Sequence, residues 1–343
     1  MQIGLGQNQV TLEQVTGGQE RFIDALTVGI ANNQVEAVAK HSQLPYQQAK
    51  ELLEKLQPML LQPTPPTTLP KRFAPKPGDP DFTVVQPTHA LAEVIRAGLT
   101  YQTEAHLVLA ERALRVVHLD SLDKVGLLLL DGLAAAGVGT VVTHDAAVIS
   151  QEDIGTDGYP AGLLGHSRVE AANLILEASQ TTTRLVRGEK LKDRQLDRVD
   201  AAILVGQQVL NPKTYSRWIN RQVPHLSLVF TTDGLAVSPV VTSGKTACLY
   251  CQHLWQQQQD QAWPVISAQL MTSRMVFDDV ANRLLGCGLA LQNALWALDA
   301  IGGFRNPSGS NQGFNYNLGL GKLSVETWKP HPDCSCQLVL GLQ

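Results

Sequence analysis

The sequence predicts an α/β fold, a doubly wound and mostly parallel sheet with helices on both faces, preceded by a smaller module. Three observations lead to this prediction. Apolar, strand-like runs alternate with helical patterns from about residue 83 onward, which is typical of parallel sheets. Eight of the 18 prolines lie between Pro58 and Pro80, a composition typical of an extended linker. The residues before them form a pattern of their own.

The first module covers residues 1–62. The stretches QIGLG and QVTLE alternate as in a short hairpin. Three helical patterns follow, the second with Asn33 as its cap and the third with Pro45 in its first turn. Their apolar positions are Phe22, Ile23, Leu26 and Ile30 in the first, and Ala49, Leu52, Leu53 and Leu56 in the third. A hairpin and three helices predict a winged-helix-like module, with an undifferentiated helical cap as the alternative.

The charge of this module argues against nucleic acid as its partner. It carries four basic and six acidic residues, a formal charge of −2, whereas DNA affinity rests largely on basic groups that neutralise phosphates. Recognition of a peptide or protein is therefore the better prediction. A winged-helix transcriptional regulator stays as an alternative.

Residues 63–82 are predicted to be a proline-rich linker, and residues 83–343 the α/β domain. Helical patterns cover 88–102, 124–137, 167–179 and 212–222, and strand patterns cover 113–119, 140–145, 183–188, 199–206, 225–234 and 322–328. The stretch from Gly309 to Gly321 is predicted to be a flexible loop before the last strand. The glutamine-rich QHLWQQQQDQAW is predicted to be an exposed crossover segment.

Bulk properties set further limits. The 343 residues carry a formal charge of −4 and are 44% apolar and 17% charged, enough apolar residues for a sizeable core. The N-terminal residues have no basic and apolar regions of a signal peptide, and the apolar stretch from Val125 to Val142 is broken by Asp131. We therefore expect a cytoplasmic protein that neither spans nor binds a membrane.

Four of the five cysteines form two close pairs. Cys248 and Cys251 form a CxxC pair, and Cys334 and Cys336 lie far along the chain in HPDCSC. Two such pairs are typical of a four-thiolate structural zinc site, with no open position for catalysis. Unliganded thiols are the alternative. Cys287 lies in an apolar helical run and is predicted to be a core residue.

The segment from His118 to Asp145 has the layout of a mononucleotide-binding βαβ unit. A strand, a turn and an apolar helix are followed by Ala-Gly-Val-Gly, a second strand and Asp145. The turn, however, carries Ser121 and Asp123 where glycines are expected, and keeps only Gly126. A tight turn and a close backbone approach to phosphate both need glycine there.

From about Ala113 to Cys336, this unit and the two cysteine pairs resemble the ThiF/MoeB family, bacterial relatives of ubiquitin-activating enzymes with a Rossmann-like fold. The first module and the HPDCSC ending are similar to ThiF-like proteins of azole-peptide biosynthesis, which hold a leader peptide. The resemblance implies ATP–Mg binding and adenylation of a C-terminal carboxylate. It also implies a homodimer, for which the apolar helix from Leu284 to Leu298 offers surface.

The residues that this resemblance assigns to adenylation are mostly replaced. Asp145 matches the acidic residue that holds the ribose, and Arg168 replaces a lysine. Thr156 stands where a phosphate-binding arginine is expected, and Gln208 stands on or near a magnesium-binding aspartate. Gly126, Asp145 and Arg168 are thus predicted to be a remnant nucleotide site without catalytic residues, and ATP–Mg is not an expected cofactor.

The prediction for function is a ThiF-like pseudoenzyme that serves as a peptide- or protein-binding scaffold with structural zinc. The first alternative is an active ATP-dependent adenylyltransferase. The side chains of His118, Asp120 and Asp123 follow one strand end. An acid–base or metal site is one interpretation of them, but we predict a polar rim.

Overall fold

The computed structural model describes residues 1–5, 8–28, 30, 34–57, 60, 91–101, 105–179, 181–188, 198–273, 275–304 and 311–337. The described residues form two compact units. One holds those up to residue 60 together with 95–101, and the other holds 91–94 and 105–337. The predicted linker at 63–82 lies outside the described residues, so the predicted domain boundaries stay predictions.

The first unit contains a hairpin and helices, as the sequence predicts. Strands β1 (Gln2–Leu5) and β2 (Asn8–Thr11) pair antiparallel. They are followed by α1 (Gly17–Val28), α2 (Val35–His41) and α3 (Tyr46–Leu56). Asn33 lies outside the described residues, and the N-cap of α2 is Gln34 instead. The core of this unit is built from Leu12, Phe22, Ile23, Ala39, Leu44, Ala49, Leu52 and Leu56.

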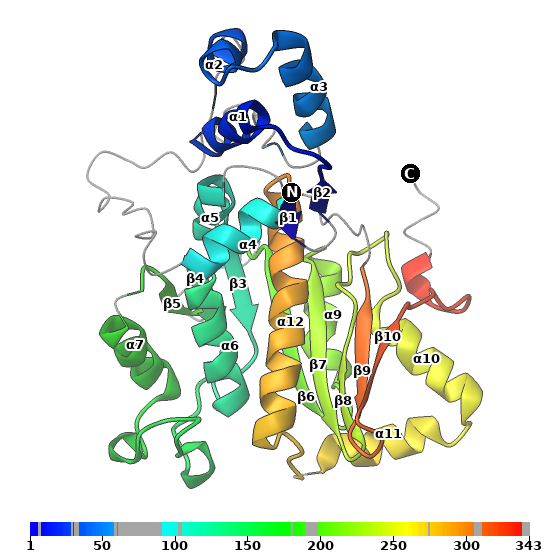
Figure 1. Cartoon of the computed structure of the whole chain (residues 1–343). Helices are drawn as coiled ribbons and strands as arrows, with labels where there is room; N and C mark the ends of the chain where they lie inside the picture. Colours follow the sequence, from blue (N-terminus) through cyan, green and yellow to red (C-terminus); the bar gives the residue numbers. More distant parts are fainter. Residues whose placement is uncertain are drawn as a thin grey trace. The chain divides into compact units, whose positions relative to one another are not determined.

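An eight-stranded sheet forms the centre of the second unit (Figure 1). Its order is β10-β9-β8-β7-β6-β3-β4-β5, parallel from β5 to β7 and antiparallel from β7 to β10. Strand order reverses between β3 and β6, the point at which doubly wound sheets bind ligands. The strands are β3 (Val116–Leu119), β4 (Thr140–Thr143), β5 (Arg184–Arg187), β6 (Ala201–Gln207), β7 (His225–Thr231), β8 (Gly234–Val237), β9 (Gly313–Asn317) and β10 (Lys322–Glu326).

Helices pack on both faces of this sheet. Alternate residues of β6 show it, because Ala201 and Ile203 join the core under α6 and α12, whereas Ala202 and Leu204 join the core under α9. The helices that lie wholly in the second unit are α5 (Ala105–Ala113), α6 (Lys124–Ala135), α7 (Arg168–Ala178), α9 (Pro212–Asn220), α10 (Leu249–Gln259), α11 (Trp263–Thr272) and α12 (Val280–Ile301), with short 3-10 turns at Gln151–Asp153, Ala161–Leu163 and Ser335–Gln337. Helix α4 (Leu91–Tyr101) has residues in both units.

The long helix α12 is a core helix and offers less surface than predicted. It is apolar and long enough to cross a membrane by composition alone. In the structure it runs along the sheet beside α6 (Figure 1), and Gly286, Cys287, Ala290 and Ala294 are buried there. Seven of the 15 positions from Leu284 to Leu298, where surface for dimerisation was predicted, are buried, whereas Leu284 is 57% exposed.

One segment expected to be a flexible loop contains a strand. Strand β9 lies inside the predicted loop from Gly309 to Gly321, and it pairs with β8 on one side and β10 on the other. The glutamine-rich segment forms most of α10. Glycine and asparagine disfavour strands in isolation, but pairing on both edges overrides that local preference.

Candidate functional site

The turn between β3 and α6 shows what Ser121 and Asp123 do at the positions where a phosphate-binding turn would have glycines. Asp123 is the N-cap of α6, and its Oδ1 accepts a hydrogen bond from the backbone N of Gly126 at 3.0 Å. Ser121 Oγ donates to Asp123 Oδ2 at 2.8 Å. Free amides at a helix N-terminus attract phosphate, but here the protein's own carboxylate takes that place. Asp123 is thus a helix cap rather than a member of a solvated polar rim.

Gly126, the retained glycine, has a packing role. A Cβ atom at this position would lie 1.9 Å from the carbonyl oxygen of Ser121. The first turn of α6 therefore approaches the preceding backbone more closely than any other residue allows. This close approach serves the contact between helix and turn and needs no nucleotide.

Asp145 and Arg168 come together beside this turn. Asp145 accepts hydrogen bonds from the backbone N atoms of Leu122 and Ala147, each at 2.7 Å. Arg168 Nη1 lies 3.3 Å from Asp145 Oδ2, and its Nη2 lies 2.8 Å from both carboxylate oxygens of the buried Asp153. The carboxylate matched to ribose binding and Arg168, which replaces the family's lysine, are therefore both engaged by the protein itself.

The other two predicted positions lie apart from this cluster. Thr156 is exposed on the loop after the 3-10 turn at Gln151–Asp153. Gln208 follows β6 with a left-handed φ of 65°, and its backbone N donates to the carbonyl of Phe230. Such a φ is uncommon for a residue other than glycine. Neither side chain offers the charge that phosphate or magnesium needs.

His118 is buried, unlike the polar rim predicted for it, whereas the side chain of Asp120 is 17% exposed. The ring of His118 is fully buried, 4.6 Å from the ring of Trp218. Its Nε2 lies 3.0 Å from His144 Nδ1 and 3.2 Å from Arg217 Nη2. Burial, Arg217 and His144 lower the pKa of His118 well below its ordinary value, so the ring is neutral. Burial raises the pKa of Asp120 to about 7, although Arg217 opposes the shift.

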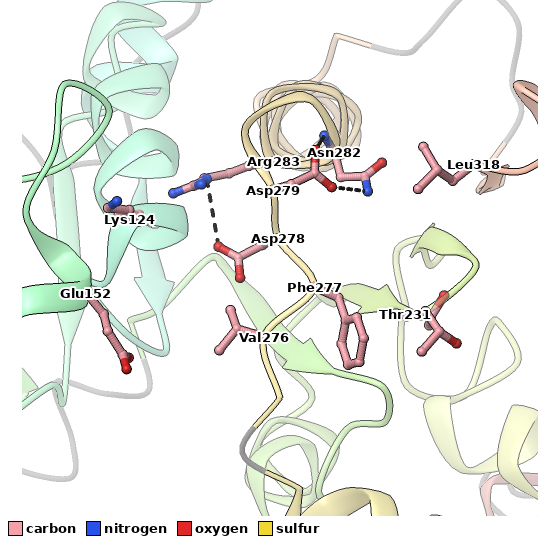
Figure 2. A pocket seen from close by; sticks show the side chains of 11 residues that line it. Lys124, Glu152, Thr231, Val276, Phe277, Asp278, Asp279, Asn282, Arg283 and Leu318 are labelled. Atoms are coloured by element: carbon pink, nitrogen blue, oxygen red, sulfur yellow. Dashed lines mark hydrogen bonds and ion pairs between the residues drawn. The ribbon is translucent and has the colours of Figure 1, made fainter.

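A cavity of about 490 Å³ opens at the carboxyl end of the sheet (Figure 2). Its lining residues come from the starts of α6 and α12, the end of β7, the segment before α12 and two loops: Lys124, Glu152, Thr231, Thr232, Val276, Phe277, Asp278, Asp279, Asn282, Arg283 and Leu318. Figure 2 shows Arg283 reaching from α12 toward Lys124, with Asp278 below it.

Ion pairs connect the two basic residues of this cavity to acidic neighbours. Lys124 Nζ lies 3.4 Å from Asp157 Oδ1, and Arg283 Nη2 lies 3.2 Å from Asp157 Oδ2. Arg283 Nε is 3.7 Å from Asp278 Oδ2, and Gln207 donates to the other oxygen of Asp278 at 2.9 Å. Burial acts to raise the pKa of Asp157, but Arg283 and Lys124 hold it below its ordinary value.

Sequence reasoning did not single out this cavity. Its residues come from distant segments, so no spacing in the chain marks them. One signal was present, because Arg283 is the only basic residue in the mostly apolar run from Val280 to Ile301 that forms α12. A buried charge of this kind needs partners, and these are the acidic residues found here.

The four predicted cysteines come together as a candidate metal centre. Their Sγ atoms all lie within 4.8 Å of one another. The shortest separations are 3.7 Å for Cys248–Cys251, 3.6 Å for Cys248–Cys334 and 3.4 Å for Cys251–Cys336. A tetrahedral zinc–thiolate site with bonds of about 2.3 Å places its sulfurs about 3.8 Å apart, so the arrangement fits zinc. Cys287, in contrast, is buried in the core as predicted.

Burial works against ionisation of these thiols in the absence of a metal. It raises the pKa of Cys334 to about 11, and it raises the pKa of Cys248 further. A bound cation reverses this preference, because a coordinating thiol is deprotonated outright. A metal held by these four thiolates would have no open coordination position, as in structural zinc sites.

Comparison with known proteins identifies the fold. No protein-family model and no curated protein sequence matches the chain. Among solved structures, it is similar to E. coli MccB with AMPCPP and MccA (TM-score 0.69) and to E. coli MccB with ATP (0.67), each at 14% identity over 98% of this chain and 94% of MccB. It is also similar to PaaA (0.59) at 13% identity, over 82% of this chain and 91% of PaaA. The predicted resemblance to the ThiF/MoeB type of fold is thereby confirmed.

Proposed function

We propose that this protein is a ThiF-like scaffold that binds a peptide or protein and has lost adenylation. Its fold is shared with MccB, whose structures include complexes with MccA. The proposed loss of adenylation rests on one observation, which is that a side chain of the protein already caps the N-terminus of α6. Asp123 caps the amide of Gly126 where a triphosphate would have to bind, and like charges at that distance repel strongly.

The first unit is the proposed peptide-recognition module. Its apolar core makes it a compact unit of its own, and its net charge of −2 disfavours nucleic acid. We propose a winged-helix-like arrangement that holds a leader peptide. The cysteine cluster would hold structural zinc, and two copies of the chain would form a homodimer, as the ThiF/MoeB resemblance implies.

Calorimetry with ATP–Mg tests the proposed loss of adenylation. We expect at most millimolar binding and no ATP–pyrophosphate exchange, because the amides are capped and Thr156 and Gln208 supply neither cation nor metal ligand. The matched variant combines Ser121→Gly with Asp123→Gly, which restores two glycines and removes the negative charge. It should bind ATP–Mg more tightly than the wild type.

The active alternative, an ATP-dependent adenylyltransferase, predicts a different result in the same experiment. It is favoured by the likeness to MccB bound to ATP. Low-micromolar binding of ATP–Mg to the wild type, or measurable pyrophosphate exchange, would establish that alternative and overturn the scaffold proposal.

Peptide binding itself is tested with the full chain and a displayed library of random peptides. Selected peptides should bind at micromolar strength by fluorescence anisotropy, and their contacts should protect amides between residues 1 and 57 from hydrogen exchange. Selection that enriches no peptide, or protection confined to the second unit, would contradict the role given to the first unit.

A further inference from the structure

We infer that two copies of this chain pair edge to edge through strand β10, so that their two sheets join into one. The inference rests on the proposed homodimer, because it names the surface that would form it. It concerns residues 322–326, which belong neither to the cysteine cluster nor to the lining of the cavity.

Strand β10 is an open edge of the sheet. It is the last strand at one end (Figure 1), and among the described residues it pairs with β9 alone. The pairing runs residue by residue from Lys322 to Glu326 without a bulge, and the strand contains no proline. The four residues from Lys322 to Val325 are all exposed. Bulges, prolines and covering segments protect the edges of natural sheets, and a regular edge without them is a template for a further strand.

The order of charges along β10 favours a second copy of the same strand. The strand reads Lys-Leu-Ser-Val-Glu, with one charge of each sign at the same distance from Ser324. When two copies pair antiparallel about a two-fold axis at Ser324, Lys322 of each copy lies opposite Glu326 of the other. Opposite charges that face each other across an antiparallel pair stabilise it, whereas like charges destabilise it. The edge is therefore complementary in charge to itself.

The register at Ser324 is also the one that uses the whole strand. Residues that lie opposite each other must point to the same face of the sheet, so the two-fold axis passes through a residue. An axis at Leu323 or Val325 leaves two residues at one end of each strand opposite residues outside β10. Neither of these registers places Lys322 opposite Glu326. With the axis at Ser324, all five positions pair.

The apolar face of β10 supports the same contact. Leu323 is 45% exposed and Val325 is 56% exposed, and the register at Ser324 places Leu323 of each copy opposite Val325 of the other. Leu320, in the turn between β9 and β10, is 76% exposed and enlarges this apolar surface. Pairing removes apolar area from water, and monomeric proteins rarely expose large contiguous apolar patches.

Charge-exchanged variants of the full-length protein test this register. Lys322→Glu places like charges opposite each other at both ends of the paired strands, and Glu326→Lys does the same with the other sign. The double variant Lys322→Glu/Glu326→Lys restores two pairs of opposite charge. Self-association is measured by sedimentation and light scattering over a range of concentrations. The control is Lys213→Glu, the same change of charge at an exposed lysine on α9.

We expect each single variant to raise the dissociation constant of the dimer at least about tenfold, because two attractive pairs become repulsive. The double variant and Lys213→Glu should stay within about threefold of the wild type. A mixture of the two single variants should associate as tightly as the wild type, because each Glu of one copy then faces a Lys of the other. Circular dichroism verifies that the variants are folded, and hydrogen exchange should show the amides of residues 322–326 more protected in the dimer.

Three outcomes overturn the inference. A dimer whose dissociation constant is the same in the wild type and in the single variants uses another surface, although the homodimer proposal then stands. Single variants that do not associate when mixed show that Lys322 and Glu326 are not opposite each other. A wild type that is monomeric at every concentration contradicts the homodimer as well, and amides of β10 that a selected peptide then protects identify a peptide as the occupant of the edge. The ATP and display experiments judge the rest of the proposed function separately.

Discussion

Gly126 shows at the scale of one residue which features of a nucleotide-binding turn belong to packing. Ser121 stands where glycine would allow the tight turn, and Asp123 stands where glycine would let the backbone approach phosphate. The glycine that remains is the one whose Cβ would lie against the carbonyl of Ser121. A turn that does not contact phosphate has no need of the first two glycines, whereas the close contact between α6 and the turn still requires glycine at position 126.

Replacing Gly126 by alanine should therefore damage folding whatever the protein binds. We expect Gly126→Ala to lower the free energy of unfolding by about 2–4 kcal/mol, because backbone atoms must move apart to admit the new methyl group. Chemical denaturation measures this. Gly162→Ala is the control, since a Cβ there meets nothing within 4 Å. A Gly126→Ala protein as stable as this control would contradict the packing role.

Asp120 should make stability depend on pH. Burial raises its pKa in the folded state to about 7, above the value of an unfolded carboxyl near 3.8. Between these two pKa values the folded state therefore binds a proton that the unfolded state has lost. The contribution of the protonated carboxyl to the free energy of unfolding is complete below about pH 4 and is lost as the pH rises through about 7.

Asp120→Asn removes the loss of stability that accompanies ionisation of this carboxyl. The variant should gain stability relative to wild type between pH 4 and 7 and keep an advantage of about 1–4 kcal/mol above it. Urea denaturation across this range measures the difference, with the exposed Asp233→Asn as control. Parallel stability curves for wild type and Asp120→Asn would show that this carboxyl titrates normally.

At the scale of elements, the cysteine cluster ties the start of α10 to the segment around the 3-10 turn at Ser335–Gln337. We expect elemental analysis to find about one zinc per chain. Cys251→Ser should abolish stoichiometric metal and destabilise the protein by at least about 2 kcal/mol, because structural zinc contributes directly to folding. Cys287→Ala, outside the cluster, should retain the metal. Protein purified without chelator that contains no metal would contradict the zinc assignment.

Elements with strong periodicity were predictable, and those that depend on their neighbours were not. The strands before and after α6 are short apolar runs, and their sequences alone indicate buried parallel strands. Strand β9 is rich in asparagine and glycine, and β8 has only four residues. Both are strands because they pair on two sides, and this information lies in distant parts of the chain.

At the scale of the molecule, the candidate sites that are marked by short spacings in the sequence were predictable, and those assembled from distant segments were not. The cysteine pairs were predictable because chelation imposes short spacings, and the altered turn because its glycines have fixed offsets. The cavity at Arg283 was not, since its cations are on α6 and α12 and its acids on intervening loops. The burial of His118 was also missed, because only the folded sheet places Trp218 and His144 against it.

A homodimer is the prediction for the whole molecule. The residues of α12 that pack on the sheet are unavailable for pairing, whereas Leu284 on the same helix is exposed. Light scattering at several protein concentrations should give twice the chain mass of 37.2 kDa. A monomer mass that does not change with concentration would contradict this prediction.

The cysteine cluster also sets an order of events during synthesis. Cys251 and Cys336 are 85 residues apart, and a ribosome adding 5–20 residues per second needs roughly 4–17 s to cover that distance. Throughout this interval Cys248 and Cys251 exist as an unfinished pair of thiols, open to oxidation or to loosely held metal. Completion of the cluster is therefore a late step in biogenesis, and a nascent chain interrupted before Cys334 carries only half of its ligands.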